Sequence, residues 1–314
     1  MAYRIKRREK FAKGVRRVVR EQLKRATGAA KAVEGEQEER VHEVRTRLKR
    51  SRAALAMIEQ RAGRNATREM RRLRDTARRL AKPRDIAVQA HTFRILRTQL
   101  PAALSPRLEA RLDLAERQMR RSLDPDKIER DLRRTARALK QVRRRTGPWK
   151  TGPGRRAVAD GVTEMYKRAR AALERVRSHP TPERLHDWRK RVKALWYQLQ
   201  IVGRAVPELA TLLAPKVERL GEILGQIHDL DCAKETIETH ERWFGPPAER
   251  EALLAIVEEW RAGLERDAFT LAETVFAGRP RDVRALIETG WRSWRHPPRQ
   301  QPATPAPHVA AYMQ

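Results

Sequence analysis

Residues 42–49 read HEVRTRLK, and the pattern returns at residues 186–193 as HDWRKRVK, 144 positions later. A second pair of segments, LAKPRDI at 80–86 and LGQIHDL at 224–230, matches at the same offset. Two matches that share one offset indicate an internal duplication with no net insertion between them. Gly14-Val15 and Gly161-Val162 add a weaker match, shifted by three residues. We therefore predict two helical repeats, at residues 1–150 and 151–295, that meet near the glycine- and proline-rich stretch 147–154.

The rest of the chain contains residues that are typical of helix ends. No useful stretch alternates β-branched with polar residues, so strands are not expected. Asp124 and Thr181 each precede a proline, as N-cap residues often do, and Asn65 is a third candidate cap. We predict an all-α protein with a disordered proline-rich tail at 296–314. The expected breaks lie near 33–36, 62–66, 81–83, 101–105, 122–125, 146–154, 179–181, 204–207, 225–228, 244–247 and 277–280.

The duplicated segments are amphipathic in an unusual way. On a helical wheel, His42, Arg45, Lys49 and Arg52 fall within about 80° of one another. The second copy repeats this basic stripe with His186, Arg189 and Lys193. A separate apolar stripe on each helix should face the core; its members are Val41, Val44, Leu48 and Leu55 in the first copy and Leu185, Trp188, Val192, Leu195 and Leu199 in the second.

The polar face of these helices carries one sign of charge. A solvated helix usually interleaves acids and bases, because like charges one turn apart destabilise it. No acid lies between Arg45 and Arg52. A row of cations at one-turn intervals suits an extended polyanion, to which Arg offers forked donors and Lys a mobile point charge.

The whole chain is strongly basic. Its 71 Lys and Arg face 40 Asp and Glu, a formal net charge of +31 over 314 residues. The excess is uneven: residues 1–150 hold 45 Lys and Arg against 18 acids, and the remainder holds 26 against 22. Such self-repulsion favours a polyanionic partner, which by charge alone could be DNA, RNA, an anionic membrane or another phosphate polymer.

Several classes of protein are disfavoured by the sequence. The single cysteine, Cys232, rules out an internal disulfide and fits a reducing cytoplasm, where we expect it to be a small buried side chain. No secretory signal and no membrane span are visible. There is also no P-loop, nucleophile elbow, HExxH or CxxC motif. The acidic run at 34–38 resembles a triphosphatase motif but opens a helix, where acids favour the dipole.

The histidines and two aspartates need separate consideration. A lone His near a helix start is more often a packing residue than a ligand, yet here one recurs in both repeats, three residues before an Arg. Zinc binding is disfavoured, because His-x-x-Arg surrounds a metal with cations. Asp85 and Asp229 each follow an expected break, so we interpret them as helix N-caps or as partners of an Arg rather than as metal ligands.

The duplicated segments resemble the CHAD family, the conserved histidine α-helical domain. The resemblance rests on segments 41–52 and 185–199, with support from Arg84-Asp85, from LGQIHD at 224–229 and from YKRAR at 166–170. It covers roughly residues 3–290. It implies two helical-bundle repeats related by pseudo-two-fold symmetry around a basic central pore or groove. It also implies a protein that binds inorganic polyphosphate without catalysing a reaction and without a cofactor.

Carried over to this chain, the resemblance makes phosphate ligands of the two stripes, with Tyr166 and Arg170 as further candidates. No triphosphatase strand accompanies the domain, so the chain resembles a stand-alone member. There are departures: Trp196 replaces the equivalent of Arg52, and His228 replaces the equivalent of Arg84. Together with the uneven charge, they predict an asymmetric site in which the first repeat dominates.

Two alternatives to polyphosphate binding stay open. Non-specific nucleic-acid binding would use the same cations, although single-strand binders usually interleave aromatic residues, and only Trp196 lies near a stripe. An enzyme acting on polyphosphate would need carboxylates to hold a metal, and only Asp85 and Asp229 lie near the stripes. We expect a cytoplasmic protein that binds polyphosphate, with roles in storage granules or phosphate homeostasis compatible with the sequence.

Overall fold

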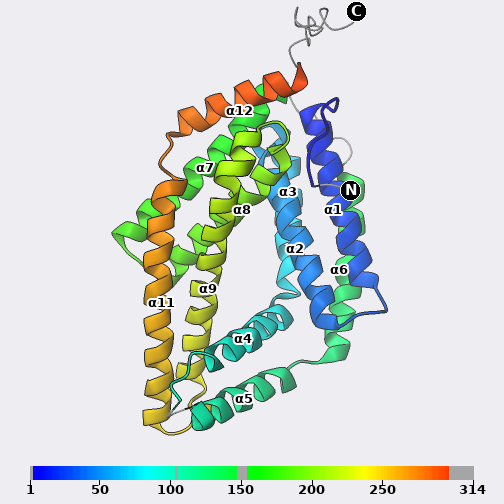
Figure 1. Ribbon diagram of the computed structural model, residues 1–314. Helices are drawn as coiled ribbons and strands as arrows, with labels where there is room; N and C mark the ends of the chain where they lie inside the picture. The colour runs from blue at the N-terminus through cyan, green and yellow to red at the C-terminus, as the bar shows by residue number, and fades with distance from the viewer. Residues whose placement is uncertain (1–2, 103–104, 147–153, 297–314) are drawn as a thin grey trace, which may run out of the picture.

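The chain folds into helices alone wherever the structure describes it. The computed structural model describes residues 3–102, 105–146 and 154–296, and within them there is no strand. This confirms the all-α prediction (Figure 1). The helices are α1 (Phe11–Lys31), α2 (Gln37–Ala56), α3 (Glu59–Arg78), α4 (Ala81–Arg97), α5 (Ser105–Arg121), α6 (Pro125–Arg145), α7 (Gly154–Ser178), α8 (Pro182–Val202), a π-helical turn (Leu209–Leu213), α9 (Ala214–Thr239), α10 (Glu241–Phe244), α11 (Pro247–Val275) and α12 (Pro280–Arg295).

Local sequence signals set many of the helix ends. The Asp124 carboxylate accepts a hydrogen bond from the Lys127 backbone N–H at 3.0 Å, and Pro125 begins α6. Thr181 Oγ1 accepts from the Arg184 backbone N–H at 3.3 Å before α8. Both predicted N-caps are therefore confirmed. The acidic run also meets a helix start as expected, since Glu36 is the N-cap residue of α2 and Glu38 lies in its first turn.

Two predicted breaks are wrong. Asn65 is not a cap, because α3 runs from Glu59 to Arg78 through the expected break at 62–66. The expected break at 225–228 lies inside α9, which is continuous from Ala214 to Thr239. Glycine and asparagine cost a helix about 1 kcal/mol or less, and neither segment holds a proline. In the first repeat Pro83 lies in the first turn of α4, where a missing N–H is tolerated.

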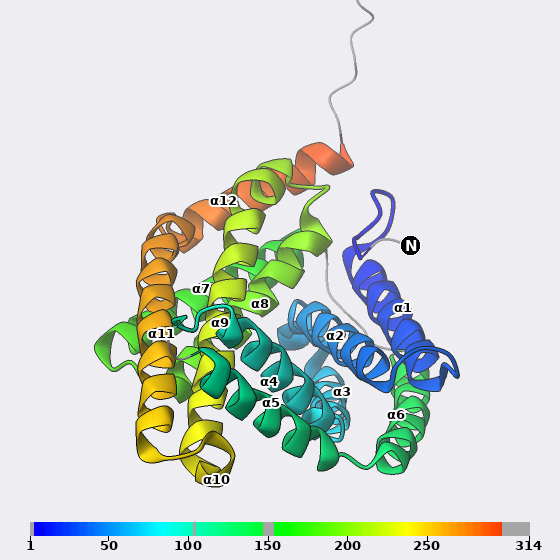
Figure 2. The same cartoon turned by 60° about the horizontal axis from the view of Figure 1, so that its bottom comes forward.

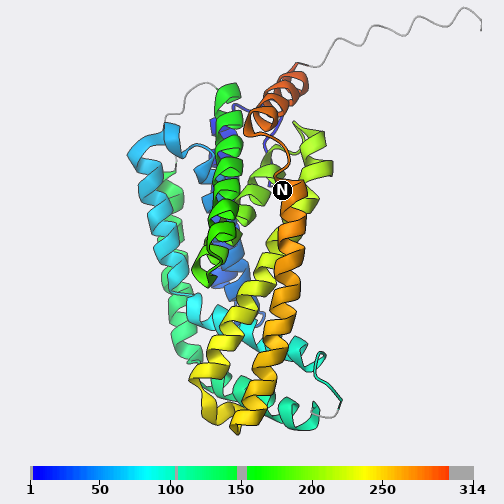
Figure 3. The ribbon, with the colours of Figure 1, turned by 90° about the vertical axis from the view of Figure 1, so that its left-hand side faces the viewer.

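The helices pack as two halves that meet at several helix pairs. In the first half α1 packs against α2 and α6, and α3 packs against α2 and α6. In the second half α7 packs against α8 and α12, and α9 packs against α8 and α11. The halves join where α2 contacts α8 and where α4 contacts α9 (Figures 1 and 2), and further contacts join α5 to α10 and α1 to α7. Figure 3 shows α9 and α11 packed side by side along much of their length, with α10 at the lower end of the pair.

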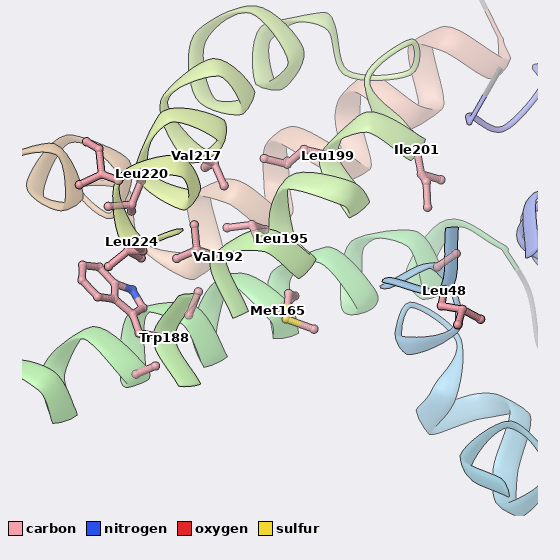
Figure 4. Close-up of a cluster of buried hydrophobic side chains, with 14 of the residues drawn as sticks. Leu48, Met165, Trp188, Val192, Leu195, Leu199, Ile201, Val217, Leu220 and Leu224 are labelled. Atoms are coloured by element: carbon pink, nitrogen blue, oxygen red, sulfur yellow. The ribbon is translucent and has the colours of Figure 1, made fainter. Parts of the chain in front are cut away.

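The predicted apolar stripes form the core. Every member of both stripes is buried, including Trp188, which is fully enclosed and stacks on Phe269 with ring centroids 6.0 Å apart. In Figure 4 the stripe of α8 faces Leu220 and Leu224 of α9. Burying this face fixes the rotation of α8, so its basic stripe must lie on another side.

Two glutamines tie the halves together. The Gln198 amide of α8 donates to the Ala53 carbonyl of α2 at 3.0 Å in a buried position. The Gln89 amide of α4 donates to the Cys232 carbonyl at 3.3 Å and to Thr236 Oγ1 at 3.0 Å, both on α9. These bonds lie at the α2–α8 and α4–α9 contacts between the halves. The predicted boundary at 147–153 and the tail from residue 297 lie outside the described residues.

Candidate anion-binding site

The basic stripes lie on two of four helices that contact one another in a closed ring, which we call the circuit. α2 contacts α8, α8 contacts α9, α9 contacts α4, and α4 contacts α2. Each helix supplies polar side chains whose charges interact across this circuit. We call these side chains the basic cluster: His42, Arg45 and Lys49 of α2, Arg84 of α4, His186, Arg189, Lys190 and Lys193 of α8, and His228 of α9. The two stripes, 144 residues apart in sequence, thus belong to one site.

Lys49 is the member most crowded by like charge. Burial, followed by the charges of Arg189, Arg45, Arg84 and Lys193, lowers the pKa of its amine to about 8. Water nevertheless reaches the side chain, which is exposed. The amine therefore lies where protein surrounds it on most sides and solvent still enters. Two of its four cationic neighbours come from the other half of the chain.

No carboxylate among the described residues forms an ion pair with a cation of the basic cluster. The same helices do form such pairs on their other faces. Arg47 binds Glu43 at 2.6 Å on α2, and Arg191 binds Asp187 at 3.0 Å on α8. These two pairs occupy equivalent positions in the duplicated segments. Glu43 and Asp187 thus form ion pairs with arginines outside the basic cluster.

The two candidate aspartates lie within the circuit rather than at helix starts. Asp85 is in the second turn of α4 and Asp229 is in the middle of α9, so the N-cap interpretation is wrong for both. Burial raises the pKa of Asp85, opposed by Arg45 and Arg84. Burial also raises the pKa of Asp229, opposed by Arg189 and Arg84. The arginines attract both carboxylates electrostatically, which agrees with the alternative of an Arg partner.

The histidines are held neutral. The rings of His186 and His228 lie 4.2 Å apart between centroids. Burial, followed by neighbouring cations, lowers the pKa of His186 to about 4 and that of His228 to about 3. Burial and then Arg84 and Lys49 also lower the pKa of His42. An anion placed among these rings would oppose both causes and favour their protonation.

Two glycines of α9 leave room for two side chains of the basic stripe of α8, a role that was not predicted from the sequence. A Cβ on Gly221 would lie 2.9 Å from Lys193 Cδ, and a Cβ on Gly225 would lie 3.5 Å from Arg189 Nε. The two long side chains therefore cross α9 where it has no side chains of its own. The sequence does contain a signal for this role, because two glycines lie one turn apart within a helical pattern. They follow the stripe residues that they accommodate by 28 and 36 positions.

In the first repeat, the counterpart of Arg189 is Arg45, which makes a different contact. Arg45 donates through Nη1 to the Ala77 carbonyl at the end of α3, at 2.8 Å. The Nε atoms of Arg45 and Arg189 are both buried without a hydrogen-bond partner among the described residues. Unpartnered buried donors are costly, and they are often found where a ligand completes the bonding.

The remaining candidates lie toward the edge of the cluster or away from it. Arg52 interacts electrostatically with Lys190 and Arg74. Tyr166 is buried, and its hydroxyl donates to the Gly278 carbonyl at 2.8 Å and to the Val275 carbonyl at 3.2 Å. Arg170 lies beside Tyr166, where its charge opposes the rise in the pKa of that phenol caused by burial. No contact of the described residues joins Tyr166 to the basic cluster.

Other chemistry finds little support in the described part of the chain. No group of three or more His, Cys, Asp or Glu side chains is arranged there to hold a metal. Cys232 is half-buried, and burial raises the pKa of its thiol to about 11, so it is a poor nucleophile. Within the same residues, no helix is both long enough and apolar enough to cross a membrane.

Comparison with known proteins identifies a family. The family model described as CHAD domain matches residues 17–238, a span that includes α2, α4, α8 and α9 almost entirely. No curated protein matches the chain.

Proposed function

The chain belongs to the CHAD domain family, and we propose that it is a non-enzymatic protein that binds inorganic polyphosphate on the basic cluster. The domain is generally a non-catalytic binding module. The observation that carries the proposal is the absence, among the described residues, of any ion pair for the cations of this cluster. Without an anion, these charges repel one another in a partly desolvated position, which is costly.

Polyphosphate fits this arrangement better than nucleic acid does. It carries a negative charge on each phosphate and has no bases, so a protein needs only closely spaced cations to bind it. A single-strand binder needs aromatic platforms for its bases. The one tryptophan at the cluster, Trp196, is covered by Lys193, whose Nζ lies 4.8 Å from the ring centroid. Its face is thus already in use for a cation–π contact.

The proposed ligands are the stripe residues together with three that the circuit adds. His42, Arg45, Lys49, Arg52, His186, Arg189 and Lys193 come from the two stripes, and Arg84, Lys190 and His228 join them. Tyr166 is a weaker candidate, because its hydroxyl would have to leave two backbone carbonyls to bind phosphate. Arg170 beside it shares that weakness.

The proposal includes the architecture and setting expected of the family. Two repeats, 1–150 and 151–295, would be related by a pseudo-two-fold axis, with the cluster lining a central pore or groove. The matching order of packing, α1 with α2 and α6 and α7 with α8 and α12, supports this relation. So does the solvent exposure of Lys49 deep among neighbouring helices. A cytoplasmic location and an association with storage granules belong to the same proposal.

Competition is the direct test. Labelled long-chain polyphosphate is bound at physiological salt and challenged with DNA, RNA and ATP at equal phosphate concentration. We expect only unlabelled polyphosphate to displace the label efficiently. Displacement by DNA at equal phosphate would reduce the proposal to generic polyanion binding through counterion release.

Paired charge reversals test the predicted dominance of the first repeat. Arg45→Glu with Lys49→Glu should abolish binding, and Arg189→Glu with Lys193→Glu should weaken it less, with helicity retained in both. Both helices bring cations to one cluster, so the greater charge of the first half must lie largely outside it. Equal losses from the two pairs would refute the asymmetry while leaving polyphosphate binding intact.

A further inference from the structure

The outer side of α1 carries a second basic recess, separate from the cluster. It is an open recess of about 600 Å³, lined by α1 and by the last turn of α6. Its cationic lining residues are Lys13, Arg16, Arg17, Arg20, Lys24 and Arg143, and two glutamates, Glu9 and Glu21, also line it. A volume of this size is typical of ligand sites in proteins.

The two acids of the recess both bind the same cation, Arg17. Arg17 contacts Glu9 at 2.9 Å through both Nε and Nη2, and it contacts Glu21 at 3.1 Å through Nη1. The same hydrogen bonds oppose the effect of burial on Glu9 and leave the pKa of that carboxyl below its usual range. Both carboxylates are thus committed to the same guanidinium. Lys13, Arg20 and Lys24 form no ion pair with any described residue, and all three are exposed.

Cationic residues follow α1 at one-turn intervals. Residues 13, 16, 20 and 24 share one face of the helix and span about 16 Å along its axis. This is the spacing of the α2 stripe, and no aromatic residue lines the recess. Arg143 adds a cation from the C-terminal end of α6, where positive charge also favours the helix dipole. The pattern again suits a chain of phosphates.

The recess and the cluster are on opposite sides of a packed core. Val15, Val18 and Leu23 of α1 are fully buried between them, and α2 follows on the inner side. One short anion therefore cannot occupy both places, whereas a long polymer can pass around the molecule and reach each. The recess also accounts for part of the excess charge of residues 1–150 that the cluster leaves unexplained.

We propose that the α1–α6 recess is a second binding site for polyphosphate, which engages long chains already held by the basic cluster. This inference rests on the proposed function. Two sites on one polymer raise its affinity by effective concentration, without any new contact at the first site. The recess would therefore give the protein a preference for long chains over short ones.

The test compares Lys13→Glu with Arg20→Glu against a matched control, Lys216→Glu with Arg266→Glu. All four residues are exposed, and each double variant lowers the net charge equally. Binding of long-chain polyphosphate and of tripolyphosphate is measured by calorimetry at physiological salt. We expect the recess variant to lose about tenfold or more in affinity for the long chain and less than about twofold for tripolyphosphate, as loss of a second site predicts. The control should lose little for either.

Each outcome decides between the two proposals. Equal losses in the recess and control variants would overturn the second site and leave the first intact. A recess variant that loses duplex DNA binding but keeps its affinity for long-chain polyphosphate would also overturn it, in favour of a nucleic-acid surface. Failure of the wild-type protein to bind polyphosphate of any length would instead overturn the proposed function.

Discussion

Binding of polyphosphate should weaken as the pH rises through 8, well below the range in which lysines ordinarily lose their charge. The perturbation is a change from pH 7 to pH 9 at constant ionic strength. Lys49, whose pKa is lowered to about 8, carries its charge in most molecules at pH 7 and in about one in ten at pH 9. The bound phosphates require the charged form. Between these two pH values the affinity should therefore fall.

The size of this fall follows from the same pKa. If only the protonated form of Lys49 binds, the dissociation constant rises about tenfold between pH 7 and pH 9. Solvent reaches the Lys49 side chain and screens its charge, so we expect a rise between about threefold and tenfold. Internal phosphates of a long chain stay ionised throughout this range. The ligand therefore contributes no matching change.

Fluorescence anisotropy with labelled long-chain polyphosphate would measure the effect. Lys49→Arg is the matched variant, because a guanidinium keeps its charge through pH 9. Its affinity should be nearly the same at both pH values. A wild-type affinity that does not change, or a Lys49→Arg variant that weakens as much as the wild type, would refute the assignment of Lys49 as a crowded phosphate ligand.

Three further predictions concern residues that the structure places in particular roles. Gly221→Ala should displace Lys193 and weaken binding severalfold while raising helix stability by up to about 1 kcal/mol, whereas Gly225→Ala, whose Cβ meets only ordinary contact, should bind normally in the same assay. Tyr166→Phe should lower the free energy of unfolding in urea by about 1 kcal/mol without changing polyphosphate affinity, and a large affinity loss would restore it as a ligand. His186, whose pKa is lowered to about 4, should take up protons when phosphate binds, so affinity should rise from pH 7 to pH 5. The affinity of His186→Gln should rise less over the same range, and an identical rise in this variant would contradict the role.

Much of the fold could be predicted because its signals are local. The apolar stripe of α8, from Leu185 to Leu199, has the period of a helix, and all its members are buried. The N-caps at Asp124 and Thr181 depend on neighbours three residues away. The same local reasoning failed at residues 225–228. There a glycine that resembles a break instead lies inside α9, where Arg189 crosses it.

The candidate site was predictable in its members but not in its arrangement. The stripe residues were identified from spacing, and His42 and His186 from their recurrence. Arg84, Lys190 and His228 were not identified as ligands, because they join the stripes only through the contacts of α4 and α9. The hydroxyl of Tyr166 has two carbonyl partners more than a hundred residues away, which no spacing indicates.

The sequence by itself determined the duplication, the helices and the faces on which their cations lie, because periodicity and capping act over a few residues. Only the tertiary structure decided that the two stripes form one cluster, that Lys49 is surrounded by Arg45, Arg84, Arg189 and Lys193, and that further cations gather along α1. These features depend on which helices pack together and at what rotation. Packing of that kind joins residues far apart in the chain, and the pKa of each group follows from it.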